Sequence, residues 1–107
     1  MTAPPLTFGP FTFDPDRAVL TSGGASIPLG QRACTLLQTL IASQGQPVTK
    51  ADLLDAAWPG LAVEEGNLTV QIAALRKALG TRADGQDWIV TVPRVGYRLI
   101  VPQARHQ

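Results

Sequence analysis

The chain of 107 residues has the length of a single domain, and its 45% hydrophobic and 16% charged residues are typical of a compact globular protein. One cysteine and one histidine exclude a disulfide framework and every multi-cysteine zinc site, so we expect no metal and no metal-dependent catalysis. No apolar run approaches the roughly 18 residues of a membrane span, and the start lacks a signal peptide. We therefore expect a cytoplasmic protein with no membrane contact from this segment.

The net charge of +1 is unevenly distributed along the chain. Residues 1–65 hold three basic and six acidic side chains, a net charge of −3, whereas residues 66–107 hold six basic and two acidic ones, a net charge of +4. Such asymmetry favours an anionic partner for the basic half, although ordinary solvation of a polar surface explains it equally well. The charge pattern alone does not decide between the two.

Short alternating runs fill the first thirty residues and predict small antiparallel strands at 6–8, 11–13, 17–21 and 25–29. The Gly23-Gly24 pair between the last two runs suits a tight hairpin turn, because glycine adopts a positive φ without steric cost. We expect a meander of three or four strands.

Two helices follow. Over residues 31–43 the apolar side chains recur at spacings of three and four, which predicts a helix that buries Cys34 as a small apolar residue. A second helix is predicted from Thr49 to about Trp58, because the Thr49 hydroxyl can cap its start and Asp52 lies in the favourable field of its first turn.

A third helix begins near Glu64, after a link from Pro59 to Glu65, and stops at Gly80. Four apolar side chains form one stripe and are expected to face the core: Leu68, Ile72, Leu75 and Leu79. The 100° step between residues then turns Val70, Ala73, Ala74 and Lys77 outward, with Asn67 and Gln71 on one shoulder and Arg76 on the other.

The outward face of the third helix is small and uncharged until its basic end. Good helix propensity explains the alanines without any function, whereas close approach of another surface explains them functionally. Asn and Gln side chains can pair with adenine in the major groove, and a valine methyl group can contact thymine. The face therefore favours DNA as the anionic partner.

The last elements form a predicted hairpin over residues 88–101, with strands at 88–92 and 97–101. Arg94 at its tip lies between Pro93 and Gly96, and an arginine held in such a stiff turn can enter a narrow minor groove. Residues 1–5 and 102–107 are expected to be an extension and a tail outside the domain.

The sequence contains no pattern typical of an enzyme. There is no Gly-rich phosphate loop ending in Lys-Ser or Lys-Thr, and no serine or cysteine beside a plausible histidine base. The acidic pairs Asp14/Asp16 and Glu64/Glu65 suit a turn and a helix start. We expect no catalytic residue and no cofactor.

The sequence resembles the OmpR/PhoB-type winged-helix DNA-binding domain of transcriptional regulators. The similarity is carried by Leu75-Arg76-Lys77-Ala78-Leu79 and by Gly96-Tyr97-Arg98, with support from residues 48–54 and Trp58, and it covers roughly residues 6–101. It implies an α+β fold, a winged helix-turn-helix with an N-terminal antiparallel sheet, a three-helix core and a C-terminal β-hairpin wing.

The resemblance also implies a function, the sequence-specific binding of double-stranded DNA as the effector domain of a bacterial, two-component-like transcriptional regulator. Helix 64–79 would enter the major groove and the wing would contact the minor groove. The predicted DNA-contacting residues are Trp58, Asn67, Val70, Gln71, Ala74, Arg76, Lys77, Arg94, Tyr97 and Arg98. Of these, the resemblance matches Trp58, Arg76 and Tyr97 to positions that contact phosphates.

The resemblance implies two further interactions. The link, with Pro59, Gly60, Leu61, Glu64 and Glu65, matches a segment that contacts RNA polymerase in some members of the family. The second implied interaction is the formation of a dimer on DNA. Since the family's usual receiver domain is absent, the chain is either a fragment of a larger regulator or a lone domain.

The chain departs from the family pattern at Gly66, Ala73 and Ala74, where many members carry arginine. Fewer phosphate and guanine contacts follow, and a modest affinity is expected. The alternative is a winged-helix protein–protein interaction module without DNA binding, in which the same helix face docks a protein. Counterion release separates the two, because it makes DNA affinity fall steeply with salt.

Overall fold

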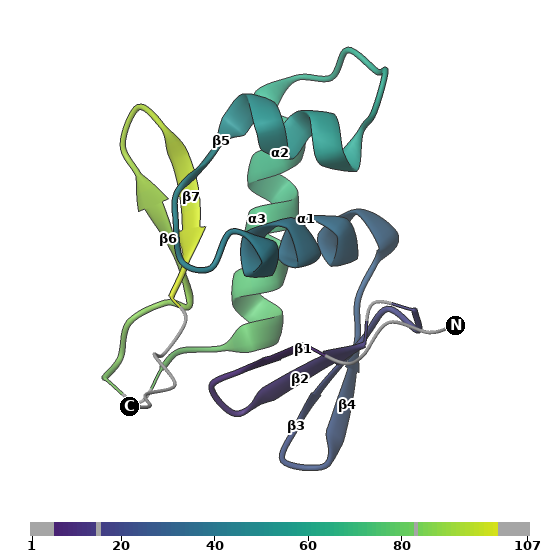
Figure 1. Ribbon diagram of the computed structural model, residues 1–107, viewed down its shortest axis with the longest axis vertical. Coiled ribbons are helices and arrows are strands. Elements are labelled where there is room, and N and C mark those ends of the chain that lie inside the picture. Colours follow the sequence, from purple (N-terminus) through teal and green to yellow (C-terminus); the bar gives the residue numbers. More distant parts are fainter. Residues whose placement is uncertain (1–5, 15, 83, 101–107) are drawn as a thin grey trace.

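The computed structural model describes residues 6–14, 16–82 and 84–100. Its elements are β1 (Leu6–Phe8), β2 (Phe11–Asp14), β3 (Val19–Ser22), β4 (Ala25–Pro28), α1 (Gln31–Ala42), β5 (Val48–Thr49), α2 (Lys50–Ala57), α3 (Glu65–Leu79), β6 (Ile89–Val92) and β7 (Gly96–Leu99). The N-terminal sheet lies at one end, the helices form the middle, and the β6–β7 hairpin lies beside α3 (Figure 1). This arrangement confirms the predicted winged helix-turn-helix fold.

The N-terminal sheet is an antiparallel meander in the order β1-β2-β3-β4, so the four-strand alternative is the correct one. Its inner face contributes Phe13 and Leu20, both fully buried, to the core. The Gly23-Gly24 turn has φ of +57° and +85°, as expected for a tight hairpin. Strand β3 begins at Val19 and not at residue 17, because the Asp14 carboxylate accepts backbone N–H groups of the two residues that open the preceding turn.

The three helices pack their apolar faces on one another and on this sheet. Helix α1 buries Cys34 as predicted, and burial raises the pKa of its thiol, which keeps the sulfur neutral. Helix α2 starts at the predicted cap, where the Thr49 hydroxyl accepts the N–H of Asp52 at 3.1 Å. Helix α3 ends at Gly80, whose φ of +70° and ψ of −161° suit glycine almost exclusively. None of the helices in the described part of the chain is both long and apolar enough to cross a membrane.

Strand β5 is absent from the sequence prediction. Its two residues are too few to show an alternating pattern, and they form a strand only because β7 pairs with them. The resulting three-stranded sheet has the order β5-β7-β6, so the hairpin is attached to the body of the protein through β7. Strand β7 ends at Leu99, earlier than predicted, and the predicted end at residue 101, the extension and the tail lie outside the described residues.

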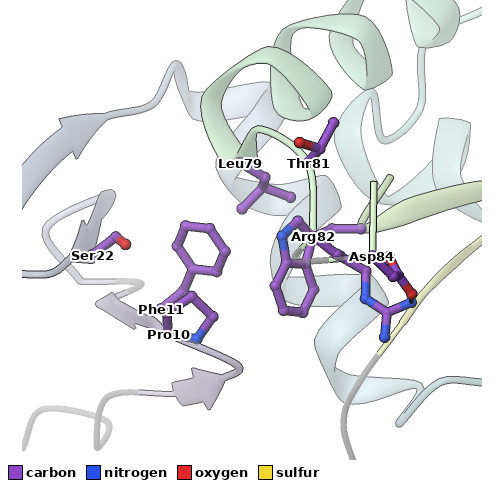
Figure 2. A pocket seen from close by; sticks show the side chains of 8 residues that line it. Pro10, Phe11, Ser22, Leu79, Thr81, Arg82 and Asp84 are labelled. Atoms are coloured by element: carbon purple, nitrogen blue, oxygen red, sulfur yellow. Dashed lines mark ion pairs between the residues drawn. The ribbon is translucent and has the colours of Figure 1, made fainter. Parts of the chain in front are cut away.

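Aromatic rings join the N-terminal sheet to the C-terminal half. Trp88 meets Phe8 and Phe11 edge to face, with ring centroids 5.7 and 5.3 Å apart. Figure 2 shows the groove of about 510 Å³ beside them, lined by Pro10, Phe11, Ser22, Leu79, Thr81, Arg82, Asp84 and Trp88. Its aromatic walls, Phe11 and Trp88, are almost completely buried, because they pack against each other. The groove therefore follows the packing contact between the N-terminal sheet and the base of the hairpin.

Gly96 is the position where the wing approaches the body most closely. A Cβ atom there would lie 2.0 Å from the backbone oxygen of Val48, so Gly96→Ala is expected to lower the free energy of unfolding by about 1 to 3 kcal/mol. Gly66→Ala, in the exposed first turn of α3 with nothing within 4 Å, is the matched control and should raise stability by up to about 1 kcal/mol. Urea denaturation measures both, and equal effects would contradict the close approach.

Candidate nucleic-acid interface

The outward face of α3 is the centre of the candidate interface. Val70 is 64% exposed, and Ala73, Ala74 and Lys77 are exposed beside it, while the predicted apolar stripe is buried on the opposite side. The periodicity therefore predicted the orientation of this helix correctly. Its surface is low and uncharged from Val70 to Ala74, a little more than one turn, and a partner can approach the helix backbone closely there.

The two amides on one shoulder of α3 are not equivalent. The Asn67 side chain donates an N–H to the Glu64 carbonyl at 3.3 Å, which ties it to the start of the helix. Gln71 is half-buried and makes no side-chain hydrogen bond to another described residue. Gln71 therefore has both its donor and its acceptor available, as bidentate pairing with a base edge requires.

Arg76 occupies the other shoulder and reaches the wing. Its Nε donates to the Ile89 backbone oxygen at 3.0 Å, and Nη2 donates to the Thr91 hydroxyl at 3.1 Å. The guanidinium also lies over the Tyr97 ring, 5.8 Å from its centroid. Sequence reasoning missed this set of contacts, since its partners lie 13 to 21 residues further along the chain and form no local pattern.

The wing tip is a tight turn over residues 92–95, closed by a hydrogen bond of 3.0 Å from the Val95 N–H to the Val92 oxygen. Arg94 is exposed there and has a φ of +67°. Pro93 before it and a positive φ at the third residue are the marks of a type II turn, in which glycine is the favoured third residue. Arginine at this position costs about 1 kcal/mol or more of backbone strain.

An equivalent turn without that strain lies in the link between α2 and α3. The Leu61 N–H donates to the Trp58 oxygen at 3.1 Å, Pro59 again comes second, and Gly60 comes third with a φ of +73°. The chain therefore uses glycine in one of these turns and arginine in the other.

The predicted aromatic contacts are core residues in this structure. Trp58 and Tyr97 are each 7% exposed. The guanidinium of Arg32 lies 5.3 Å from the centroid of the Trp58 ring, and it donates to the Ala57 oxygen. The burial of Trp58 supports core packing, and any phosphate contact of either ring is restricted to its exposed edge.

Arg98 lies on the other face of the wing from Tyr97, because neighbouring residues of a strand point to opposite faces. It is half-buried opposite Val90 in the antiparallel ladder. The structure therefore does not bring Arg98 together with Arg76 and the recognition face of α3.

Lys50 is a cation near the interface that sequence reasoning did not include. Its Nζ lies 2.7 Å from Glu65 Oε2, which joins the start of α2 to the start of α3, and its backbone N–H donates to the Val95 oxygen of the wing. The hydrogen bond to Glu65 raises the pKa of the Lys50 ammonium, so this lysine stays charged. Because Lys50 and Glu65 lie 15 residues apart, no local sequence pattern predicts their ion pair.

The link itself presents a mixed surface. Leu61 is 58% exposed, and Pro59, Gly60, Glu64 and Glu65 are exposed around it. Val63 packs against the core and fixes the link to the body. Within the described residues no group of three or more His, Cys, Asp or Glu side chains could hold a metal ion.

A family model and a curated relative match this chain over most of its length. The family model described as "Transcriptional regulatory protein, C terminal" matches residues 24–99. The cholera toxin homolog transcriptional activator of Vibrio parahaemolyticus is 33% identical over 95 residues, which cover 84% of this chain and 32% of that protein. The chain thus spans about a third of the length of this curated relative.

Solved structures of similar fold cover nearly the whole chain. The DNA-binding domain of Escherichia coli CadC superposes with a TM-score of 0.84 at 28% identity, covering 95% of this chain and 96% of that one. The Klebsiella pneumoniae RstA DNA-binding domain, solved in complex with the RstA box, gives a TM-score of 0.74 at 28% identity, covering 89% and 95%.

Replacing Arg94 by glycine is expected to relieve the strain of the wing turn. Arg94→Gly should raise the free energy of unfolding by about 0.5 to 1 kcal/mol, because the gain at positive φ exceeds the entropy that glycine adds to the unfolded chain. Arg94→Ala keeps the strain and should leave stability nearly unchanged. Thermal and urea unfolding compare the two, and equal stabilities would show that the turn is not strained.

Proposed function

The chain belongs to the family of C-terminal domains of transcriptional regulatory proteins, and on that basis we propose that it binds double-stranded DNA sequence-specifically. Helix α3 enters the major groove and the β6–β7 wing lies along the adjacent minor groove. The observation that carries the proposal is the exposed, small and uncharged face of α3, flanked by Gln71 and Lys77 and continued by an exposed arginine at the wing tip.

The charges near this face suit a phosphate backbone. Lys77 lies near the C-terminal end of α3 and Arg94 at the wing tip, and both are exposed. Phosphates attract these cations regardless of sequence, whereas base edges in the groove are recognised by amides and methyl groups. In this proposal, the cations provide affinity for any DNA, and the amide and methyl groups provide specificity for its sequence.

Gln71 is the proposed base-contacting residue. It lies in the N-terminal half of α3, the part that a recognition helix inserts deepest, and its amide is available. Val70 beside it offers a methyl group to thymine. Asn67 and Ala74 complete the predicted major-groove surface, while Trp58, Tyr97 and Arg98 remain predicted contacts at its periphery.

The proposal gives the chain a binding role and no catalytic one. A domain that binds chromosomal DNA acts in the cytoplasm. The chain spans about a third of the length of the curated relative, and the proposal concerns DNA binding by this domain.

A second contact is proposed for the link between α2 and α3. An exposed leucine next to the Glu64 carboxylate, with Glu65 paired to Lys50, suits a partner surface that is apolar with a basic group at its rim, and RNA polymerase is the partner that the family resemblance implies. Dimerisation on DNA is likewise a proposal, which depends on how two sites are spaced along the duplex.

The first test of DNA binding is its salt dependence. We expect 4 to 6 phosphates to be neutralised, which gives a log–log slope of affinity against salt of about −4 to −5. A selection from random duplexes supplies the best site, and fluorescence anisotropy at several salt concentrations measures the slope. A slope near zero would favour the alternative, a protein–protein interaction module.

The second test separates specificity from affinity within α3. Gln71→Ala should cost about 1 to 3 kcal/mol on the preferred site and relax the preference at one or two base pairs, with nonspecific binding little changed. Lys77→Ala, one turn and a half further along, should weaken binding to all duplexes and flatten the salt slope by about one unit. An equal loss on every duplex for Gln71→Ala would shift the base-contacting role to Asn67 and Val70.

A further inference from the structure

Arg76 contacts both strands of the wing. On β6 it donates to the Ile89 backbone oxygen and to the Thr91 hydroxyl, at 3.0 and 3.1 Å, and on β7 it covers the ring of Tyr97. Its side chain is only 31% exposed, and Asp87 Oδ2 lies 3.9 Å from Nε. The guanidinium is thus packed between the recognition helix and the hairpin.

Besides the core packing of Trp88 and Ile89, backbone hydrogen bonds hold the wing through β7. Val48 and Thr49 of β5 pair with Tyr97 and Gly96, and the Lys50 N–H donates to the Val95 oxygen. Strand β6 lies at the outer edge of the order β5-β7-β6. Its Ile89 oxygen has its hydrogen-bond donor on α3, so Arg76 anchors the side of the hairpin that β5 does not reach.

We propose that Arg76 is a positioning residue that holds the wing at one fixed spacing from α3, so that the two elements meet adjacent grooves as a single rigid unit. This role rests on the proposed DNA binding and adds to it, because it assigns to Arg76 an action inside the protein besides any phosphate contact. Two of its five N–H donors are used on the wing, and the others stay available.

Lysine is not expected to replace Arg76 in this role. A guanidinium presents its donors in a planar fork and stacks on an aromatic face, which fits one backbone oxygen, one hydroxyl and one ring at once. An ammonium keeps the positive charge for a phosphate but cannot keep this geometry. The charge and the positioning role can therefore be separated by Arg76→Lys, while Thr91→Val removes one acceptor and leaves every charge in place.

Hydrogen exchange on the free protein tests the positioning directly. Arg76→Lys and Thr91→Val should speed exchange of the amides of residues 89–99 by about fivefold or more, because the hairpin opens locally. Lys77→Ala, next along the helix and outside these contacts, is the matched control and should leave those rates unchanged. Unchanged rates in both test variants, with the fold verified by circular dichroism, would overturn the proposal.

A double-mutant cycle with the wing tip tests the consequence for DNA. If Arg76 acts by holding the wing, Arg76→Lys should weaken binding roughly fivefold to tenfold in the wild-type background and less than about twofold in the Arg94→Ala background. Equal losses in both backgrounds would mean an independent phosphate contact and would overturn the positioning role. Should the wild type bind no duplex, the proposed function itself fails, and the exchange rates still decide whether Arg76 fixes the hairpin.

Discussion

Helix α3 buries four apolar side chains in the core, and the geometry of the interface follows from that packing. Leu68 and Leu75 are fully buried, and Ile72 and Leu79 are nearly so. Each such side chain contributes about 2 kcal/mol, so together they contribute about 8 kcal/mol, which is comparable to the whole stability of a small domain. Rotating the helix by one residue would forfeit much of this energy. The burial therefore fixes which side chains of α3 face outward, independently of any partner.

The same packing places the two flanks of α3 in different surroundings. One shoulder carries Gln71, which is free of internal hydrogen bonds to described residues, and the other carries Arg76, which is committed to the wing. Since the two lie on opposite flanks of one helix, the proposed base-contacting side chain and the proposed wing-positioning side chain keep a constant relation. The close approach of Gly96 to Val48 sets the remaining side of the hairpin.

Local patterns predicted the features that depend on local structure. The Thr49 cap and the Gly23-Gly24 turn involve residues within a few positions of each other, the stripe of α3 repeats over about three turns of one helix, and the structure has all three. Strand β5 and the contacts of Arg76 depend on residues brought together by folding, and no periodicity encodes them. The sequence suggested a stiff wing tip, but the positive φ of Arg94 follows only from its place as third residue of a closed turn.

Under the proposed DNA binding, the scarcity of cations on α3 gives a reason for a wing that is fixed before binding. Gly66, Ala73 and Ala74 offer no charge to a phosphate, so the affinity has to come from few contacts, and each loses more if it must first be ordered. A wing whose backbone is held by β5 and, as proposed, by Arg76 presents Arg94 with less backbone entropy left to lose on binding. The strain of about 1 kcal/mol at that residue is small beside a charge-assisted contact in a narrow groove, which is stronger than an ordinary hydrogen bond. A tip that is strained but preorganised is therefore what a recognition helix with so few charges requires.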